Sequence, residues 1–345
     1  MLNYVGDGGS EKYVMDLMLS LGAERCILVY SDKGPGLKAF EDLNVTMYQV
    51  KMKHPFDVSA ARQLKQIINK ENVEVVHAQF LRENYIGAIA KVLGAKVKLI
   101  WTYHVDVPMS LPVRFLNSLV TRLNHTVIAV SDFMKKSLER KGVSSNKIKL
   151  IYNGIDCGDF SKDKKVNSIA IISIIGRLRE EKGHLFLLDS LAILQDKHPE
   201  YQWICHMFGE GPDKEKIEQK IEALGFQSKV ILKGFSTNKE EMLHESDIIV
   251  VPSRNEALSY VAIEALAYGT PAIVTDVGGL PEVVKDKETG FVVDYGNKDK
   301  LAEQIGVLLS DEVLYRQFAQ NGKEHFNRHF TLKKMIEETE KVYRD

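Results

Sequence analysis

Residues 248–275 restrict the fold of this chain more than any other stretch. The continuous apolar run from Ile248 to Val251 ends at Pro252 and is typical of a strand buried on both faces, as in a parallel sheet. A helix is predicted from about Tyr260 to Gly269, because glycine commonly ends helices and Pro271 cannot continue one. Residues 272–275 form the next apolar run. Strand, loop, helix and strand in this order predict a doubly wound α/β sheet.

Two glutamates flank the start of this helix. Glu256 lies in the loop after the first strand, and Glu264 lies about one turn inside the helix. Most helical glutamates are solvated, but Glu264 has apolar neighbours on nearly all sides, so a buried carboxylate with a hydroxyl or cationic partner is predicted. In open α/β sheets, ligands bind at the carboxyl ends of the strands. Both glutamates are therefore candidate ligand-binding residues.

The same alternation of strands and helices runs through both halves of the chain. It stops at a polar stretch, residues 161–168, which predicts a linker between two domains. The predicted strands are residues 26–30, 73–77, 99–103, 127–130 and 148–152 in the first half, and residues 169–175, 203–208, 230–232, 248–251, 272–275 and 291–293 in the second. We expect two doubly wound domains that face one another across a ligand-binding cleft.

The first strand is predicted to be short. Residues 1–5 are at most the end of a strand, and Gly8-Gly9-Ser10 then opens a helix from about Glu11 to Leu21, with Ser10 as a candidate N-cap. A strand in this position is normally central, so we expect a gap in the sheet. Either the start site is assigned too late or the chain is truncated, and both would affect stability or activity.

Composition and charge exclude several classes of protein. The 345 residues are 44% apolar and 27% charged, as in soluble globular proteins, and suit two domains. Residues 1–160 carry 21 Lys/Arg and 16 Asp/Glu, a net charge of +5, and the remainder has −6. This bias fits either a solvated surface or contact with an anionic membrane. No apolar stretch could span a bilayer, no signal peptide is evident, and a cytosolic location is expected.

Metal and disulfide chemistry are not expected. The three cysteines are scattered and indicate reduced core residues. His325 and His329 have the spacing of a metal pair on a helix, but no third ligand accompanies them. No Asp-x-Asp metal-holding motif occurs.

A second candidate site follows the strand at residues 169–175. Arg177 and Lys182 lie five positions apart in a short glycine-flanked loop, where both cations can converge on one diphosphate. The alternative is that both are solvated surface charges. Gly8-Gly9 at a helix start could present free N–H groups to a phosphate or a sugar oxygen, although it is also an ordinary turn. No G-x-G-x-x-G occurs, so nicotinamide binding is poorly supported.

These segments together resemble the retaining glycosyltransferases of family 4. The resemblance rests on the E-x7-E spacing of Glu256 and Glu264 with the following glycine and proline, on the Arg-x4-Lys pair, and on the order of glycine-rich landmarks from residue 8 to residue 290. It implies a GT-B fold with an acceptor-side domain over residues 1–160 and a nucleotide-sugar domain over residues 161–325. A C-terminal helix, residues 326–345, is expected to pack back on the first domain.

The resemblance also implies roles for individual residues. Arg177 and Lys182 are expected to bind the donor diphosphate, Glu264 the ribose hydroxyls, and Glu256 the sugar. His104 ends the strand at residues 99–103 where a family histidine contacts the donor sugar, although here Val105 separates it from Asp106. The expected catalytic set is Glu256, Arg177, Lys182 and His104. The further donor contacts are Gly9, Gly209, Phe235 and the backbone N–H groups of Leu258 and Ser259.

The function implied is transfer of a hexose-type unit, with retention of configuration, to a glycan or lipid-linked acceptor in cell-surface polysaccharide synthesis. We expect a UDP-sugar rather than a GDP-sugar as donor, no metal or other cofactor, and no nucleic-acid partner. The apolar stretch at residues 108–123 is either a lip for a lipid-linked acceptor at the inner face of a membrane or a buried helix face.

Three other functions remain open. A glycosidase would use Glu256 and Glu264 as its two carboxylates but would leave Arg177 and Lys182 unexplained. A nucleotide-sugar epimerase of related architecture would consume donor without an acceptor. The third is a non-catalytic nucleotide-sugar-binding or assembly subunit; the intact glutamate and cation pairs argue against it, whereas the short first strand is compatible with it.

Overall fold

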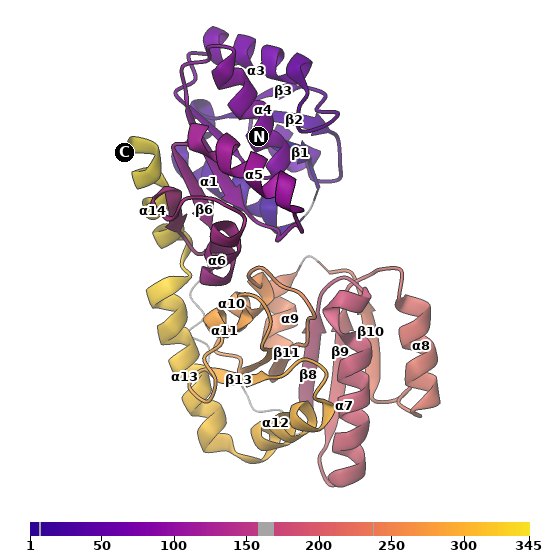
Figure 1. Cartoon of the computed structure of the whole chain (residues 1–345). Coiled ribbons are helices and arrows are strands. Elements are labelled where there is room, and N and C mark those ends of the chain that lie inside the picture. Colours follow the sequence, from indigo (N-terminus) through magenta and orange to yellow (C-terminus); the bar gives the residue numbers. More distant parts are fainter. Residues whose placement is uncertain (7, 158–168, 237) are drawn as a thin grey trace. The chain divides into compact units, whose positions relative to one another are not determined.

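The computed structural model describes residues 1–6, 8–157, 169–236 and 238–345, and the expected linker at residues 161–168 lies outside this part of the chain (Figure 1). The chain forms two compact units. Unit 1 comprises Met1–Asn153 and Leu332–Asp345, and unit 2 comprises Gly154–Thr331. Each unit has its own parallel sheet or sheets.

Unit 1 contains two short parallel sheets. One has the order β1-β2-β3 and the other the order β4-β5-β6-β7. The strands are β1 (Leu2–Tyr4), β2 (Ile27–Asp32), β3 (Thr46–Gln49), β4 (Val75–Ala78), β5 (Lys98–Tyr103), β6 (Thr126–Ala129) and β7 (Ile148–Leu150). The helices between them are α1 (Gly9–Leu21), α2 (Leu37–Asp42), α3 (Val58–Lys70), α4 (Leu81–Val92), α5 (Leu111–Val120) and α6 (Asp132–Arg140).

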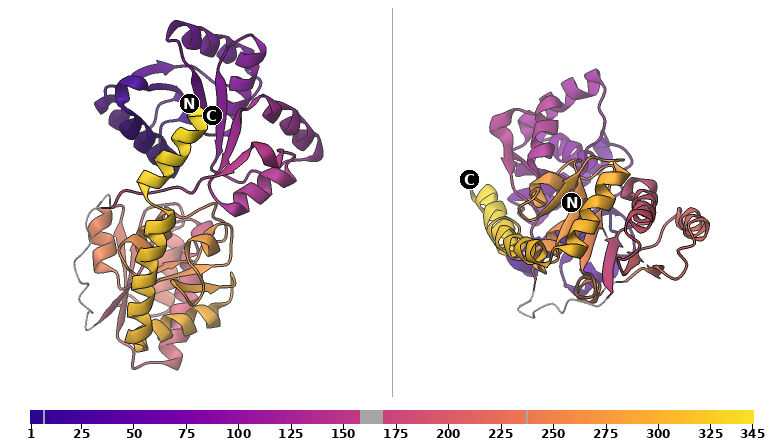
Figure 2. Two further views of the ribbon diagram at one scale, coloured as in Figure 1. Left: turned by 90° about the vertical axis from the view of Figure 1, so that its left-hand side faces the viewer. Right: turned by 90° about the horizontal axis from the view of Figure 1, so that it is seen from below.

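Helices cover both faces of these sheets, which is why most of the strands bury apolar side chains on both faces. Leu28 and Ile100 point into a core that includes side chains of α1, whereas the adjacent Val29 and Leu99 point into a second core with α3 and α4. The helix α14 (Leu332–Arg344) contributes Met335, Ile336 and Val342 to the first core. The two chain ends therefore lie beside each other in unit 1 (Figure 2).

The start of the chain differs in detail from the sequence prediction. β1 is a three-residue strand that pairs with β2 through Leu2 and Tyr4. The predicted helix start at Glu11 with a Ser10 N-cap is wrong, because α1 begins at Gly9 and Gly8 occupies the N-cap position. The Glu11 carboxylate accepts hydrogen bonds from the Ser10 hydroxyl at 2.8 Å and the Gly6 N–H at 3.3 Å. Glu11, rather than a Ser10 cap, therefore binds the backbone of the turn before α1.

Unit 2 has one six-stranded parallel sheet of order β10-β9-β8-β11-β12-β13. Its strands are β8 (Ala170–Ile175), β9 (Trp203–Phe208), β10 (Val230–Gly234), β11 (Ile248–Val251), β12 (Ala272–Thr275) and β13 (Gly290–Val293). Its helices are α7 (His184–Lys197), α8 (Lys214–Ala223), α9 (Lys239–Glu245), α10 (Tyr260–Ala267), α11 (Leu280–Val283), α12 (Lys298–Ser310) and α13 (Glu312–His329).

The strand order of unit 2 reverses between β8 and β11. From β8 the chain proceeds outward through β9 and β10, then returns to β11 and proceeds outward on the other side. The connections that follow β8 and β11 therefore run to opposite sides of the sheet, and in open α/β sheets ligands bind in the crevice at such a switch point, outside the carboxyl ends of the strands. This position is the strongest topological indication of a ligand site in unit 2.

The predicted fold class, two doubly wound α/β domains, is confirmed. Every predicted strand is present within a few residues of its expected ends, and β3 is an additional strand that the sequence analysis did not predict. The segment expected as one C-terminal helix is divided, because α13 ends at His329 and α14 begins at Leu332. Residues 332–345 belong to unit 1.

Candidate active site

The loops after β8 and β11 lie against each other at the strand-order reversal of unit 2. The Arg254 N–H donates to the Glu181 carbonyl at 2.8 Å. Gly183 has a left-handed backbone with φ of 78°, and a Cβ on it would lie 2.0 Å from the Pro252 carbonyl oxygen. Only glycine allows so close an approach, so it helps to bring residues 177–182 beside residues 253–259.

This approach brings together Lys182 and Glu256, which lie 74 positions apart in the sequence. Their Nζ and Oε2 atoms are 2.6 Å apart, and the side chains are 31% and 15% exposed. Arg177 is exposed on the same loop, directly after β8. The structure thus places two of the predicted diphosphate and sugar ligands in direct contact and the third beside them.

Glu264 is buried in α10, as its apolar neighbours predicted. Its side chain is 7% exposed and forms an ion pair with Lys239, the first residue of α9. A cationic partner was expected, but the sequence analysis did not identify Lys239. Lys239 lies 25 positions earlier and in no recognisable motif, so only the approach of α9 to α10 reveals it.

The start of α10 completes the crevice in unit 2. The Ser259 side chain caps the helix by accepting from the Ala262 N–H at 3.3 Å. The N–H groups of Leu258 and Ser259 have no hydrogen-bond acceptor among the residues that the structure describes. Free N–H groups at a helix start favour an anion.

The other predicted contacts of unit 2 lie along the same edge of the sheet. Gly209 follows β9, and a Cβ on it would lie 2.0 Å from the Gly176 carbonyl oxygen, so it packs directly against the loop that carries Arg177. Phe235 follows β10 and is 67% exposed. Such an exposed ring next to a polar crevice is available for stacking.

The remaining two predicted residues, Gly9 and His104, belong to unit 1. His104 lines a cavity of about 450 Å³ together with Glu11 and Gln79. Its Nε2–H donates to the side-chain Oε1 of Gln79 at 2.8 Å, and burial lowers the pKa of His104 to about 3. The imidazole is therefore neutral at physiological pH and suited to hydrogen bonding rather than charge pairing.

The same cavity has a second polar group that the sequence analysis did not identify. Glu83 on α4 is fully buried, and neither carboxylate oxygen has a hydrogen-bond partner among the described residues. Burial raises its pKa. An unpartnered buried carboxyl group that faces a cavity is available to a ligand hydroxyl or cation. Asp106, in contrast, is engaged by Lys141, Ser137 and Tyr103 and has a structural role.

Metal and membrane-spanning features are not found in the described part of the chain. No group of three or more His, Cys, Asp or Glu side chains there has an arrangement that could hold a metal ion. His325 instead lies 3.3 Å from the Glu282 carbonyl oxygen. None of the described helices combines the length and apolarity needed to cross a bilayer.

The chain matches two family descriptions that divide it near its middle. Residues 7–159 match "Glycosyltransferase Family 4", and residues 159–325 match "Glycosyl transferases group 1". The N-acetyl-alpha-D-glucosaminyl L-malate synthase of Bacillus anthracis is 27% identical over 321 residues, which are 89% of this chain and 84% of that protein. An N-acetylgalactosaminyltransferase of Campylobacter jejuni, which by name acts on a diphospho-undecaprenol glycan, is 24% identical over 92% of both chains.

Solved structures agree on the fold. A glycosyltransferase from Rickettsia africae superposes with a TM-score of 0.87 at 23% identity and covers 99% of this chain and 97% of its own. HepE from Anabaena, solved in complex with UDP, superposes with a TM-score of 0.86 at 20% identity. The match covers 99% of this chain and 98% of HepE. Both halves of the chain, in order, thus match glycosyltransferase domains, and the two Rossmann-like units match their fold. The chain is a glycosyltransferase enzyme of the family 4 type with the GT-B fold.

Proposed function

We propose that this glycosyltransferase transfers a hexose-type unit from a UDP-sugar to a glycan or lipid-linked acceptor with retention of configuration, in cell-surface polysaccharide synthesis. In this reaction the bond from the anomeric carbon to the donor phosphate breaks and a bond to the acceptor oxygen forms on the same face of the sugar. UDP leaves with the bonding electron pair, and the proton of the acceptor hydroxyl passes to the departing diphosphate oxygen. Stabilising the departing diphosphate is then the main catalytic demand.

Unit 2 supplies the groups for this stabilisation. Lys182 and Arg177 are the cations of the crevice, and the N–H groups of Leu258 and Ser259 add a partial positive charge at the start of α10. Glu256 neutralises Lys182 at 2.6 Å. We propose that the donor diphosphate takes over this contact and that Glu256 then accepts hydrogen bonds from the sugar hydroxyls.

The nucleoside is proposed to bind along the same edge. Glu264 would exchange Lys239 for the two ribose hydroxyls, since both partners donate hydrogen bonds to a buried carboxylate. Phe235 would stack on the base from the end of β10, beside Gly209. The preference for uridine draws support from the UDP complex of the similar Anabaena protein.

Unit 1 is proposed to serve the acceptor and the reacting sugar. Neutral His104 would donate or accept a single hydrogen bond to the donor sugar, and Gly9 would allow close approach at the start of α1. The unpartnered Glu83 carboxyl group would receive an acceptor hydroxyl in the 450 Å³ cavity. This volume suits a sugar or two rather than a polymer segment.

A lipid-linked acceptor is supported by α5. Leu111, Val113, Phe115 and Leu119 of this helix are all exposed, so the expected alternative of a buried helix face is wrong for these side chains. Arg114 lies among them in the sequence, and Arg122 follows them. Exposed apolar side chains with neighbouring cations suit the surface of an anionic membrane, and we propose peripheral contact there.

The observation that carries the proposal is the Lys182–Glu256 pair beside buried Glu264 at the strand-order reversal. The decisive experiment incubates the enzyme with UDP-glucose, UDP-galactose and their N-acetylated forms plus a lipid-linked acceptor, and determines the anomeric configuration of the product by NMR. A retained configuration in the presence of EDTA is expected. An inverted product, or conversion of the UDP-sugar to its epimer without acceptor, would refute the proposal.

A further inference from the structure

Gln79 is the hydrogen-bond partner of His104 in unit 1, and the proposed function gives it no role. It follows β4 directly, as His104 follows β5. The parallel register pairs Ala78 with Trp101, so both side chains leave neighbouring strands at the same edge of the sheet. Gln79 is 2% exposed, and its Oε1 lies 2.8 Å from the His104 Nε2. Sequence alone thus places an amide beside the imidazole.

Two aromatic rings hold the His104 imidazole from its sides. The Tyr13 ring lies edge-to-face with it at 5.0 Å between centroids, and the Phe80 ring is tilted against it at 6.1 Å. The second ring nitrogen, Nδ1, has no hydrogen-bond partner in the described part of the chain, and His104 lines the cavity of about 450 Å³. Nδ1 is therefore the polar ring atom available to a ligand in this cavity.

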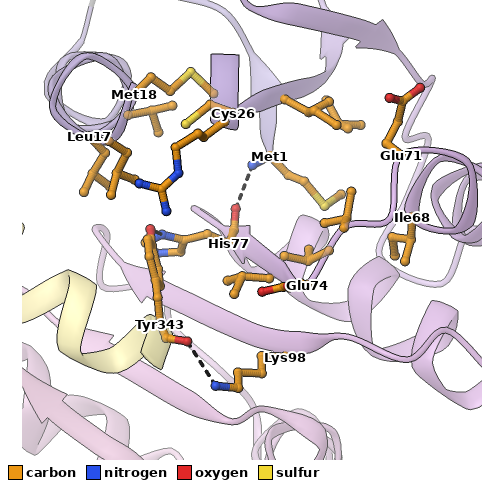
Figure 3. A pocket seen from close by; sticks show the side chains of 18 of the residues that line it. Met1, Leu17, Met18, Cys26, Ile68, Glu71, Glu74, His77, Lys98 and Tyr343 are labelled. Atoms are coloured by element: carbon orange, nitrogen blue, oxygen red, sulfur yellow. Dashed lines mark hydrogen bonds between the residues drawn. The ribbon is translucent and has the colours of Figure 1, made fainter. Parts of the chain in front are cut away.

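Tyr13 is anchored by a chain of buried hydrogen bonds that ends on the C-terminal helix α14. Its hydroxyl lies 3.4 Å from the Thr102 hydroxyl, which lies 2.6 Å from the Nε2 of His77. The Nδ1 of His77 lies 2.6 Å from the Tyr343 hydroxyl. Figure 3 shows the Tyr343 side chain extending from α14 to the His77 ring, in a cavity of about 720 Å³ that Gln79 also lines. The plane of the neighbouring imidazole is thus fixed from several elements of unit 1.

The amide partner decides which nitrogen of His104 carries the proton. Burial lowers the pKa of His104 to about 3, so the imidazole is neutral and has one N–H group. A side-chain carbonyl oxygen can only accept a hydrogen bond, so Nε2 holds the proton when it faces the Gln79 Oε1. Nδ1 then has only a lone pair and can only accept.

We propose that Gln79 is a positioning residue that holds His104 as the Nε2–H tautomer, so that Nδ1 accepts a hydrogen bond from a hydroxyl group of the donor sugar. This role rests on the proposed function, in which His104 contacts that sugar. It restricts the donor to sugars that present a hydroxyl proton to His104. A carboxylate at the same place has no proton to donate and is repelled by the lone pair.

The tautomer is measured without ligand, by nitrogen NMR of the 345-residue chain with isotope-labelled histidine, and His104→Phe identifies the His104 signals. The parent is expected to have a protonated Nε2 and an unprotonated Nδ1. Gln79→Met removes the acceptor and should give a mixture of both tautomers. Gln79→Glu retains an acceptor and should restore the Nε2–H form at about pH 8.5, above the ordinary pKa of histidine. Gln49→Met, which removes an amide bond to the Ser31 carbonyl in the same unit, is the matched control and should leave these signals unchanged.

The contact with the sugar is tested by calorimetry with UDP-glucose and its deoxy and deoxyfluoro analogues, each affinity being taken relative to that for UDP. Analogues of UDP-galactose replace them if UDP-galactose binds more tightly. Fluorine cannot donate a hydrogen bond, so at one sugar position the fluoro analogue should bind as weakly as the deoxy analogue, about three- to tenfold below the parent sugar. His104→Phe should abolish this loss, and Gln79→Met should reduce it to less than about twofold.

An unprotonated Nε2 in the parent would overturn the proposal, and so would fluoro analogues that bind as tightly as the parent sugar at every position. A parent-like tautomer in Gln79→Met would also overturn it. If Gln79→Met does not fold, Gln79→Glu decides, and an Nδ1–H form there at about pH 8.5 counts against the role of Gln79. A chain that does not bind UDP would refute the proposed function of the crevice in unit 2, whereas the tautomer, measured without ligand, still decides the role of Gln79.

Discussion

Replacing Lys182 by methionine is the sharpest test of the diphosphate site. The Lys182 Nζ lies 2.6 Å from the Glu256 Oε2, and the two side chains are 31% and 15% exposed. A charge-assisted hydrogen bond of this kind contributes about 1.5–3 kcal/mol. Loss of the contact with a bound diphosphate should weaken UDP binding by roughly 10- to 150-fold. Uridine, which has no phosphate, should bind nearly as before.

The substitution also acts on the unliganded protein. Methionine leaves the Glu256 carboxylate partly buried without its cation, which should lower the free energy of unfolding by about 1–3 kcal/mol. Pairing Lys182→Met with Glu256→Gln removes the unpaired charge, so stability should largely return while UDP affinity stays low. This double-mutant cycle separates a structural from a ligand-binding role.

Isothermal titration calorimetry with UDP and uridine, together with urea unfolding, provides the readouts. Lys197→Met is the matched control, because Lys197 forms an exposed ion pair with Asp299 in the same unit. It should change UDP affinity by less than about twofold. If Lys182→Met binds UDP as tightly as the parent, or if uridine loses as much affinity as UDP, the assignment of this crevice to the diphosphate is mistaken.

The remaining predictions concern other parts of the chain. Glu264→Ala should weaken the binding of uridine and of UDP to a similar extent in calorimetry. Glu256→Ala should leave the affinity for uridine nearly unchanged and lower the rate of sugar transfer. Equal effects of both substitutions would refute the separate ribose and sugar roles. Burial lowers the pKa of His184 to about 4, so the unfolded chain binds an extra proton between pH 6.5 and 4, and stability falls as the pH drops through this window. Urea unfolding at several pH values should show that the free energy of unfolding of His184→Gln depends less steeply on pH, by up to about 1.4 kcal/mol per pH unit in this window. An unchanged pH dependence would contradict the burial argument. Phe115→Ser should reduce sedimentation with anionic vesicles several-fold while leaving UDP affinity unchanged, and unaltered sedimentation would exclude α5 from membrane contact.

The strand pattern was predictable because parallel strands are apolar on both faces. Runs such as Ile248–Val251 stand out in the sequence and match β11 at both ends. β3 was missed because Thr46–Gln49 is polar and partly exposed, as an edge strand often is. The N-terminal end of α1 was placed two residues late because Ser10 is a strong N-cap residue type, whereas Glu11 supplies the turn contacts here.

The candidate site was predictable where its residues follow strands directly. Arg177 and Glu256 could be assigned to one sheet edge from their position after apolar runs, and the structure places them in adjacent loops. Lys239 and Glu83 could not be found in this way. Lys239 becomes relevant only through the packing of α9 near α10, and Glu83 resembles any other helical glutamate until its burial is known.

The path of the chain through unit 1 has a consequence for how the protein is made. Unit 2 is one continuous stretch, so it has all of its own residues once position 331 has left the ribosome. Unit 1 still lacks part of its core at that point, because Met335, Ile336 and Val342 of α14 belong to it. The Tyr343 hydroxyl, also on α14, lies 2.6 Å from the His77 ring nitrogen. During synthesis the first unit therefore stays incompletely packed until residues 332–345 have been made, and the second unit is free to fold first.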